Sequence, residues 1–158
     1  LADTIWRSYN DKISSGQKIS LASYPELLSA YHFLYKATTE PAFLEKIEVF
    51  TTWYKQEQSF DGSFPNFAKT LSPSPYTRGT GKIFEVLSLD PQKNKNIVEK
   101  TFNWLITMQY NDINTYFVLP EFRDKIKGGF RHDYTNHEAW IDASAHFLIG
   151  ISRLISNK

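Results

Sequence analysis

The chain has 158 residues, of which 16% are aromatic and none is cysteine, and its formal net charge at pH 7 is +1. Acidic and basic residues are dispersed, which argues against nucleic acid as the main partner because nucleic-acid-binding proteins concentrate basic charge. No run approaches the roughly 18 apolar residues of a membrane span. The lack of cysteine excludes disulfides, thiolate nucleophiles and cysteine-bound zinc. No pattern specifies a cofactor or a compartment.

Apolar residues at helical spacing occur in six segments. They predict helices over residues 2–13, 24–37, 41–54, 77–89, 94–110 and 137–155. Pro25 and Pro41 suit the first turn of a helix, and Asp90-Pro91 separates the fourth helix from the fifth. The only strand pattern covers residues 115–119, inside an additional segment of residues 111–127. The sequence therefore predicts an all-α fold.

Two stretches of the chain repeat each other. Trp53 precedes Gln58 by five positions (58 − 53), and Trp104 precedes Gln109 by five (109 − 104). A glycine-aromatic turn and a second helix follow each pair. A repeat of roughly 50 residues built in this way predicts stacked helical hairpins. We expect a single domain of residues 1–158 with about three αα-hairpins and six helices, the repeats covering approximately 1–37, 41–89 and 94–157.

The run Gln58-x-x-Asp61-Gly62-Ser63-Phe64 resembles the QW-type repeat of the terpenoid cyclase and protein prenyltransferase superfamily, as does the Gly128-Gly129-Phe130 turn with the helix after it. The resemblance covers about two thirds of the chain. It implies an αα-toroid, a fold that polysaccharide lyases and other glycan-active enzymes also use. It also implies structural roles for Gln58, Gln109, Phe64 and Phe130, with the glutamine capping a helix end and the aromatic ring packing against it.

The chain departs from the catalytic patterns of this superfamily. The Asp-rich DxDD motif of class II terpene cyclases is absent, and so is the cysteine of the prenyltransferase zinc site. A full toroid holds five to seven hairpins, whereas this chain supplies about three. The resemblance therefore implies an open or partial αα-toroid, either an open arc or a half-toroid whose remainder lies on another chain or domain.

Alignment of the two repeats places Arg78 against Asp142 and Lys82 against His146. Arg78 and Lys82 are four positions apart in one helix, and Asp142 and His146 are four positions apart in the other. Each helix therefore carries its two residues on one face. These are the second helices of their hairpins, which form the inner ring of a toroid. We therefore expect Arg78, Lys82 and Glu85 to bind substrate, and Asp142 and His146 to be catalytic. Simple pairing of Arg78 with Asp142 across adjacent helices, an exposed Glu85 and a buried structural His146 are the alternatives.

The densest polar cluster lies before the last helix, in residues 131–137. Imidazole titrates near neutrality, so His132 and His137 suit general acid–base work. Tyr134 is a candidate proton donor, as tyrosines are in many polysaccharide lyases, and Tyr76 is a candidate donor or substrate-binding residue. Arg131 suits neutralisation of a uronate carboxylate. The predicted catalytic set is therefore His132, Tyr134, His137, Asp142 and His146, and the predicted substrate-binding set is Tyr76, Arg78, Lys82, Glu85 and Arg131.

Several of these residues have alternative roles. Asp133 or Asn136 would also serve as a helix N-cap, and Asp61 suits local backbone hydrogen bonds in its Asp-Gly turn more than catalysis. A metal could be ligated by two or more of His132, His137, Asp142 and His146. Their spacing matches no established zinc motif, so we predict no metal site.

Three functions fit these patterns. We expect an αα-toroid domain of a carbohydrate-active protein, in which inner-helix polar residues and aromatic rings bind or process a glycan. One alternative is a segment of a terpenoid or prenyl-type enzyme, which an apolar, aromatic-walled cavity would favour. The other is a non-catalytic helical repeat module that docks a partner chain. The sequence leaves open whether the protein is an enzyme.

Overall fold

The computed structural model describes residues 4, 7–8, 11–12, 15, 17–69 and 74–156. These residues form one short 3₁₀-helix and six α-helices, with isolated β-bridges and no strand. The predicted all-α class is thus confirmed. In chain order the elements are η1 (Leu21–Ser23), α2 (Pro25–Thr38), α3 (Pro41–Glu57), α4 (Thr77–Leu87), α5 (Lys95–Met108), α6 (Pro120–Ile126) and α7 (Ile141–Ser156).

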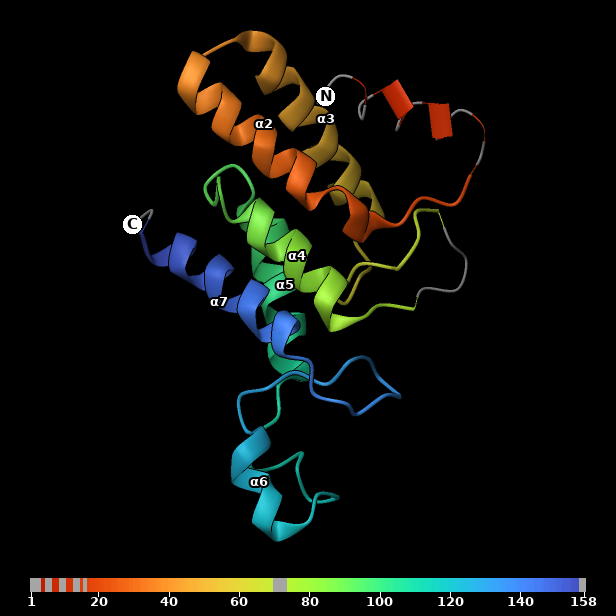
Figure 1. Ribbon diagram of the computed structural model, residues 1–158, viewed down its shortest axis with the longest axis vertical. Helices are drawn as coiled ribbons and strands as arrows, with labels where there is room; N and C mark the ends of the chain where they lie inside the picture. The colour runs from red at the N-terminus through yellow and green to blue at the C-terminus, as the bar shows by residue number, and fades with distance from the viewer. Residues whose placement is uncertain are drawn as a thin grey trace.

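Helices α2, α4 and α7 lie side by side and run in the same direction (Figure 1). Helices α4 and α7 start at the same level, because Arg78 near the start of α4 pairs with Asp142 near the start of α7. Further along, Arg153 of α7 donates a hydrogen bond to the backbone carbonyl of Glu85. These three helices form one layer, with α4 between its two neighbours.

Helices α3 and α5 run in the opposite direction to the helices that they cover. The ring of Tyr24, just before α2, contacts Trp53 near the end of α3, with centroids 5.9 Å apart. The ring of Tyr31, in the second half of α2, contacts Phe43 at the start of α3, with centroids 6.2 Å apart. Alternation of a parallel layer with reversed helices is what stacked αα-hairpins produce.

Helix α4 packs most extensively on α7, and two aromatic rings and a glycine make this contact close. Phe84 of α4 stacks on Phe147 of α7, with ring centroids 5.7 Å apart. Gly150 lies against the same ring, since a Cβ added there would meet Phe84 carbons at 2.5 Å. The Phe84 ring also packs on Phe102 of α5, with centroids 6.3 Å apart, and Phe102 in turn lies 5.8 Å from Phe147. The buried core is therefore continuous through α4.

The predicted helix of residues 137–155 begins later than expected. Helix α7 starts at Ile141, because Arg131 and Ala139 form an antiparallel bridge that precedes the helix. The predicted helix over residues 2–13 lies largely outside the described residues, and this includes its apolar stripe of Ile5, Trp6, Tyr9 and Ile13.

The strand pattern at residues 115–119 was misleading, because this part of the chain forms turns. The Thr115 hydroxyl donates to the Asn111 carbonyl at 2.9 Å, which closes a local turn. The additional segment also contains α6, which Pro120 opens at its first position. Periodicity did not predict α6 because seven residues give only two turns of pattern.

Candidate functional site

The repeated glutamine and glycine have the same geometry in both copies of the motif. Gln58 and Gln109 each follow the last residue of an outer helix, α3 and α5. The Gln58 side-chain amide donates to the Gly62 carbonyl at 3.2 Å, and that of Gln109 donates to the Gly128 carbonyl at 2.9 Å. Both glycines have positive φ, +96° and +82°. The motif therefore shapes the connections that lead from α3 to α4 and from α5 towards α7.

Gln58 also ties the two outer helices together. Its amide donates to the Ile97 carbonyl at 3.1 Å and to the Thr101 hydroxyl at 2.9 Å, both on α5. The aromatic residues of the two turns, Phe64 and Phe130, are almost fully buried. All four residues that the repeat singled out as structural therefore lie in the scaffold.

The residues that differ between the repeats meet along α4 and α7. Arg78 Nε lies 2.6 Å from Asp142 Oδ2, and both side chains are partly exposed. This confirms the alternative in which the two residues pair across adjacent helices. A paired guanidinium and carboxylate still present N–H donors and oxygen acceptors to a ligand at the surface.

A second set of contacts continues along the same pair of helices. His146 Nδ1 lies 2.6 Å from Glu85 Oε2, and Arg153 Nη2 lies 3.1 Å from Glu85 Oε1. The Glu85 side chain is only 18% exposed, so both of its oxygens are held by α7. His146 is therefore neither alone nor fully buried, and Glu85 is not freely exposed.

Lys82 extends the polar contacts from α4 to α2, where it forms an ion pair with Glu26. Burial raises the pKa of the Glu26 carboxyl, but the hydrogen bond and charge of Lys82, with a smaller effect of His146, bring it below its ordinary value. Lys82 and Glu85 lie three positions apart on α4, so the contacts of α4 with α2 and with α7 are neighbours. We call Glu26, Arg78, Lys82, Glu85, Asp142, His146 and Arg153 the polar strip.

Three rings lie at the N-terminal end of α4 and α7. His132 stacks on Tyr76 with ring centroids 5.7 Å apart, and its other neighbour is Trp140 at 4.7 Å. Burial raises the pKa of Tyr76, and the charges of Arg78 and Asp142 also act on it in opposite directions. These rings, which we call the aromatic trio, therefore adjoin the Arg78–Asp142 end of the polar strip.

The backbone fixes the aromatic trio to the start of α4. The Thr77 amide donates to the His132 carbonyl at 2.8 Å, and its hydroxyl donates to the Arg131 carbonyl at 2.8 Å. His132 Nδ1 lies 2.8 Å from Asp133 Oδ2. The other Asp133 oxygen accepts bonds from Thr135 and Asn136, so its pKa, although raised by burial, falls well below the usual range.

Tyr134 connects the two repeats instead of facing the polar strip. Its hydroxyl donates to Asp61 Oδ2 at 2.6 Å and accepts a bond from Trp104 Nε1 at 2.6 Å. Burial and the bond to Asp61 raise the Tyr134 pKa, so the hydroxyl stays protonated and holds the carboxylate. Asp61 also accepts the Ser63 amide at 2.9 Å, which confirms its predicted local role.

Two other predicted site residues have structural contacts away from the polar strip. The His137 carbonyl accepts a hydrogen bond from the Tyr110 hydroxyl, and its ring lies 4.8 Å from that of Phe117 in the additional segment. Arg131 Nη2 donates to the Thr107 carbonyl at 2.9 Å. The structure thus gathers Tyr76, Arg78, Lys82, Glu85, His132, Asp142 and His146, and holds Arg131, Tyr134 and His137 elsewhere.

Sequence reasoning missed three residues of this region: Glu26, Trp140 and Arg153. Glu26 follows Tyr24-Pro25 at the start of α2, as Arg78 and Asp142 follow the starts of their helices. Aligning the weak first repeat with the other two would have found it. Arg153 lies seven positions after His146, two helical turns away, which places both on one face.

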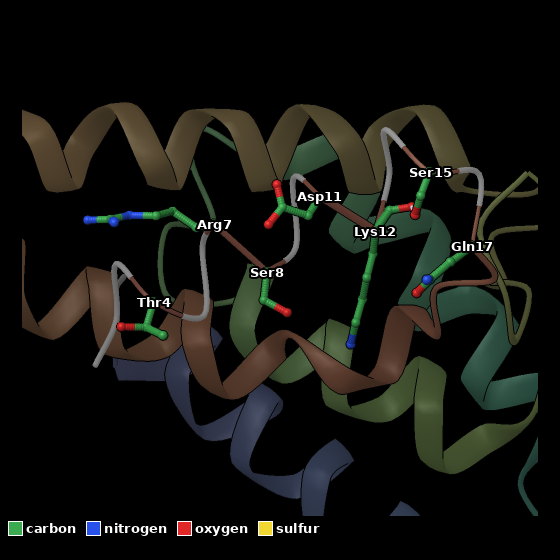
Figure 2. Close-up of a pocket in the computed structure, with 7 residues that line it drawn as sticks. All are labelled: Thr4, Arg7, Ser8, Asp11, Lys12, Ser15 and Gln17. Atoms are coloured by element: carbon green, nitrogen blue, oxygen red, sulfur yellow. The ribbon is translucent and has the colours of Figure 1, made fainter.

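A separate pocket of about 630 Å³ lies near the N-terminus (Figure 2). All its lining side chains are exposed, and none is a predicted site residue; they are Thr4, Arg7, Ser8, Asp11, Lys12, Ser15 and Gln17. The pocket is therefore not part of the candidate site.

Within the described part of the chain, no group of three or more His, Cys, Asp or Glu side chains could hold a metal ion. The metal alternative for the histidines therefore has no geometric support there. Among the helices of the described residues, none is both long and apolar enough to span a bilayer. No family model matches the chain, and no match was found among curated proteins or solved structures. The function is therefore inferred from the geometry of the site.

Proposed function

We propose that this protein binds a glycan at the N-terminal end of α4 and α7, as an αα-toroid-type domain of a carbohydrate-active protein. The observation that carries the proposal is the meeting of the aromatic trio with the Arg78–Asp142 pair. A sugar ring has an apolar face of C–H groups and a rim of hydroxyls. Aromatic rings suit the face, and paired charged groups suit the hydroxyls because each hydroxyl both donates and accepts.

The arrangement of the helices supports the toroid part of the proposal. In a toroid, the parallel α2, α4 and α7 would form the inner ring, and the reversed α3 and α5 would form the outer one. The polar strip lies on the inner helices, where a toroid binds its ligand. A charged strip suits a polar ligand and counts against a terpenoid or prenyl substrate, which would need an apolar wall.

The test is titration of a panel of neutral and acidic oligosaccharides, followed by calorimetry. Trp140→Ala and Asp142→Ala should each weaken binding about tenfold, the effect of losing a contact of roughly 1.4 kcal/mol. Lys93→Ala is the matched control, because Lys93 forms a 2.8 Å ion pair with Glu48 on the outer layer. Absence of binding to every oligosaccharide would sink the proposal, and so would equal losses in the control.

A second candidate function is docking of a partner chain along α7. Ile141, Leu148 and Ile155 of α7 are all more than 60% exposed. The residues 64 positions before the first two (141 − 77 and 148 − 84) are Thr77 and Phe84 of α4, and both are fully buried under the next repeat. On α4, this face is buried against α7. The equivalent face of α7 is exposed. We propose that another αα-hairpin of this type binds there, and a second copy of this chain supplies one.

Light scattering over a concentration range tests this second candidate. The wild-type chain should show a mass above the 18.4 kDa of one chain, and Leu148→Asp should return it to 18.4 kDa. Ile113→Asp is the control, because Ile113 is 87% exposed but lies in the additional segment, away from α7. A monomer at every concentration would rule out the second copy as the partner.

A further inference from the structure

The charges of the polar strip are compensated in pairs. Arg78 pairs with Asp142 at 2.6 Å, Lys82 pairs with Glu26, and Arg153 pairs with Glu85 at 3.1 Å. Three cations therefore face three carboxylates, and the strip has no net charge when His146 is neutral. Each of these three cations already has a carboxylate partner, so none is free to bind an anionic ligand.

Arg131, which precedes His132 of the aromatic trio, is held outside the polar strip. Arg131 was the residue expected to neutralise a uronate carboxylate, but its guanidinium bonds the Thr107 carbonyl on α5. Its Nε is buried with no hydrogen-bond partner, so that nitrogen is closed to a ligand in solution. A uronate bound at the trio would lie beside Asp142, and the cations of the polar strip are already paired with carboxylates.

A neutral sugar places no such demand on the strip. Each hydroxyl donates one bond and accepts others. The Arg78–Asp142 pair offers N–H donors beside oxygen acceptors, and both side chains are more than a third exposed. Two adjacent hydroxyls can bond to both partners of the pair without separating them. The rings of Tyr76 and Trp140 meanwhile contact the uncharged face of the sugar.

We infer that the ligand is a neutral glycan, built from sugars that have neither carboxylate nor sulfate groups. This inference rests on the proposed glycan-binding function and narrows its ligand class. The partnered charges orient the sugar through its hydroxyls, and the aromatic trio holds one ring at the N-terminal end of α4 and α7. Because the cations and carboxylates of the strip are paired with one another and the ligand carries no charge, binding depends little on ionic strength.

The experiment compares neutral oligosaccharides with oligogalacturonates of equal length by calorimetry, at about 0.01 M and about 0.15 M salt. We expect neutral oligosaccharides to bind at least tenfold more tightly, with less than a twofold change in affinity between the two salt concentrations. Tighter binding of the uronates, or a steep loss of affinity with salt, would overturn the inference and leave the proposed function standing. Binding of neither class would overturn the proposed function itself.

Charge-removing variants sharpen the comparison. Asp142→Asn keeps the shape of the side chain and leaves Arg78 without its carboxylate, so it should lower the preference for neutral sugars at least tenfold. Arg78→Gln is the matched variant, and it should weaken uronate binding further without creating a free cation. Circular dichroism would check that both variants fold. An unchanged preference in folded Asp142→Asn would contradict a role for the pair in selecting the ligand.

Discussion

The two repeated glycines provide a matched pair of substitutions. Gly62 and Gly128 both have positive φ, so alanine at either position carries the penalty of a left-handed backbone, about 1–2 kcal/mol. Their surroundings differ. A Cβ on Gly62 would lie 2.2 Å from the Lys100 carbonyl oxygen of α5, whereas a Cβ on Gly128 would meet no atom within 4 Å. The clash involves helix backbone, which cannot move aside as a flexible side chain would.

We therefore expect Gly128→Ala to lower the unfolding free energy by about 1–2 kcal/mol. Gly62→Ala should lower it by about 3–4 kcal/mol, since overpacking adds roughly 1–3 kcal/mol. Urea denaturation measures both values. With a slope of about 2 kcal/mol/M, the midpoints of the two variants should differ by about 1 M. Midpoints within about 0.2 M of each other would refute the close approach of the Gly62 turn to α5.

Three further predictions concern stability. Gln58→Ala should cost about 2 kcal/mol by urea denaturation and Gln109→Ala about 1 kcal/mol, because the Gln58 amide contacts three acceptors and the Gln109 amide one; equal costs would contradict this. Gly150→Ala should lower the melting temperature by about 2–12 °C, because its Cβ would overlap the Phe84 ring, and an unchanged melting temperature would show that the ring can move. Because the pKa of Asp133 is lowered in the folded state, its carboxylate stabilises the fold at pH values above the ordinary pKa of 3.8, and this stability is lost as the pH falls through the lower folded-state pKa. Asp133→Asn should therefore weaken the dependence of the unfolding free energy on pH, measured from about pH 7 to about pH 2.

The sequence predicted α2, α3, α4, α5 and α7, each from an apolar pattern of three turns or more. Helices α4 and α5 begin at Thr77 and Lys95, at or next to the predicted positions. Helix α7 began four residues late, because pairing of Arg131 with Ala139 overrides the local pattern. Short α6 escaped prediction because two turns carry too few apolar positions to show a period.

The candidate site was predictable only in part. The repeat alignment found Arg78 and Asp142, because equivalent positions on neighbouring parallel helices fall at the same height. It did not predict that His146 contacts Glu85, since that contact depends on the axial offset between α7 and α4. Tyr134 was misleading because its bonds to Asp61 and Trp104 join segments far apart in the chain. Such bonds depend on tertiary packing, which a local pattern does not contain.

The central position of α4 has a consequence for how the protein unfolds. The α2–α3 pair packs on α4 through α2, and α5 and α7, whose Phe102 and Phe147 rings touch, each pack on α4 as well; the Gln58 amide adds a link from the end of α3 to α5. Either pair can therefore open while α4 stays packed on the other, whereas α4 cannot be released unless both pairs separate. Amide hydrogens of α4 should then exchange with solvent most slowly among the described helices, and those of α3 and α7 sooner. The helix that carries Arg78, Lys82 and Glu85 would thus be the last to lose its structure.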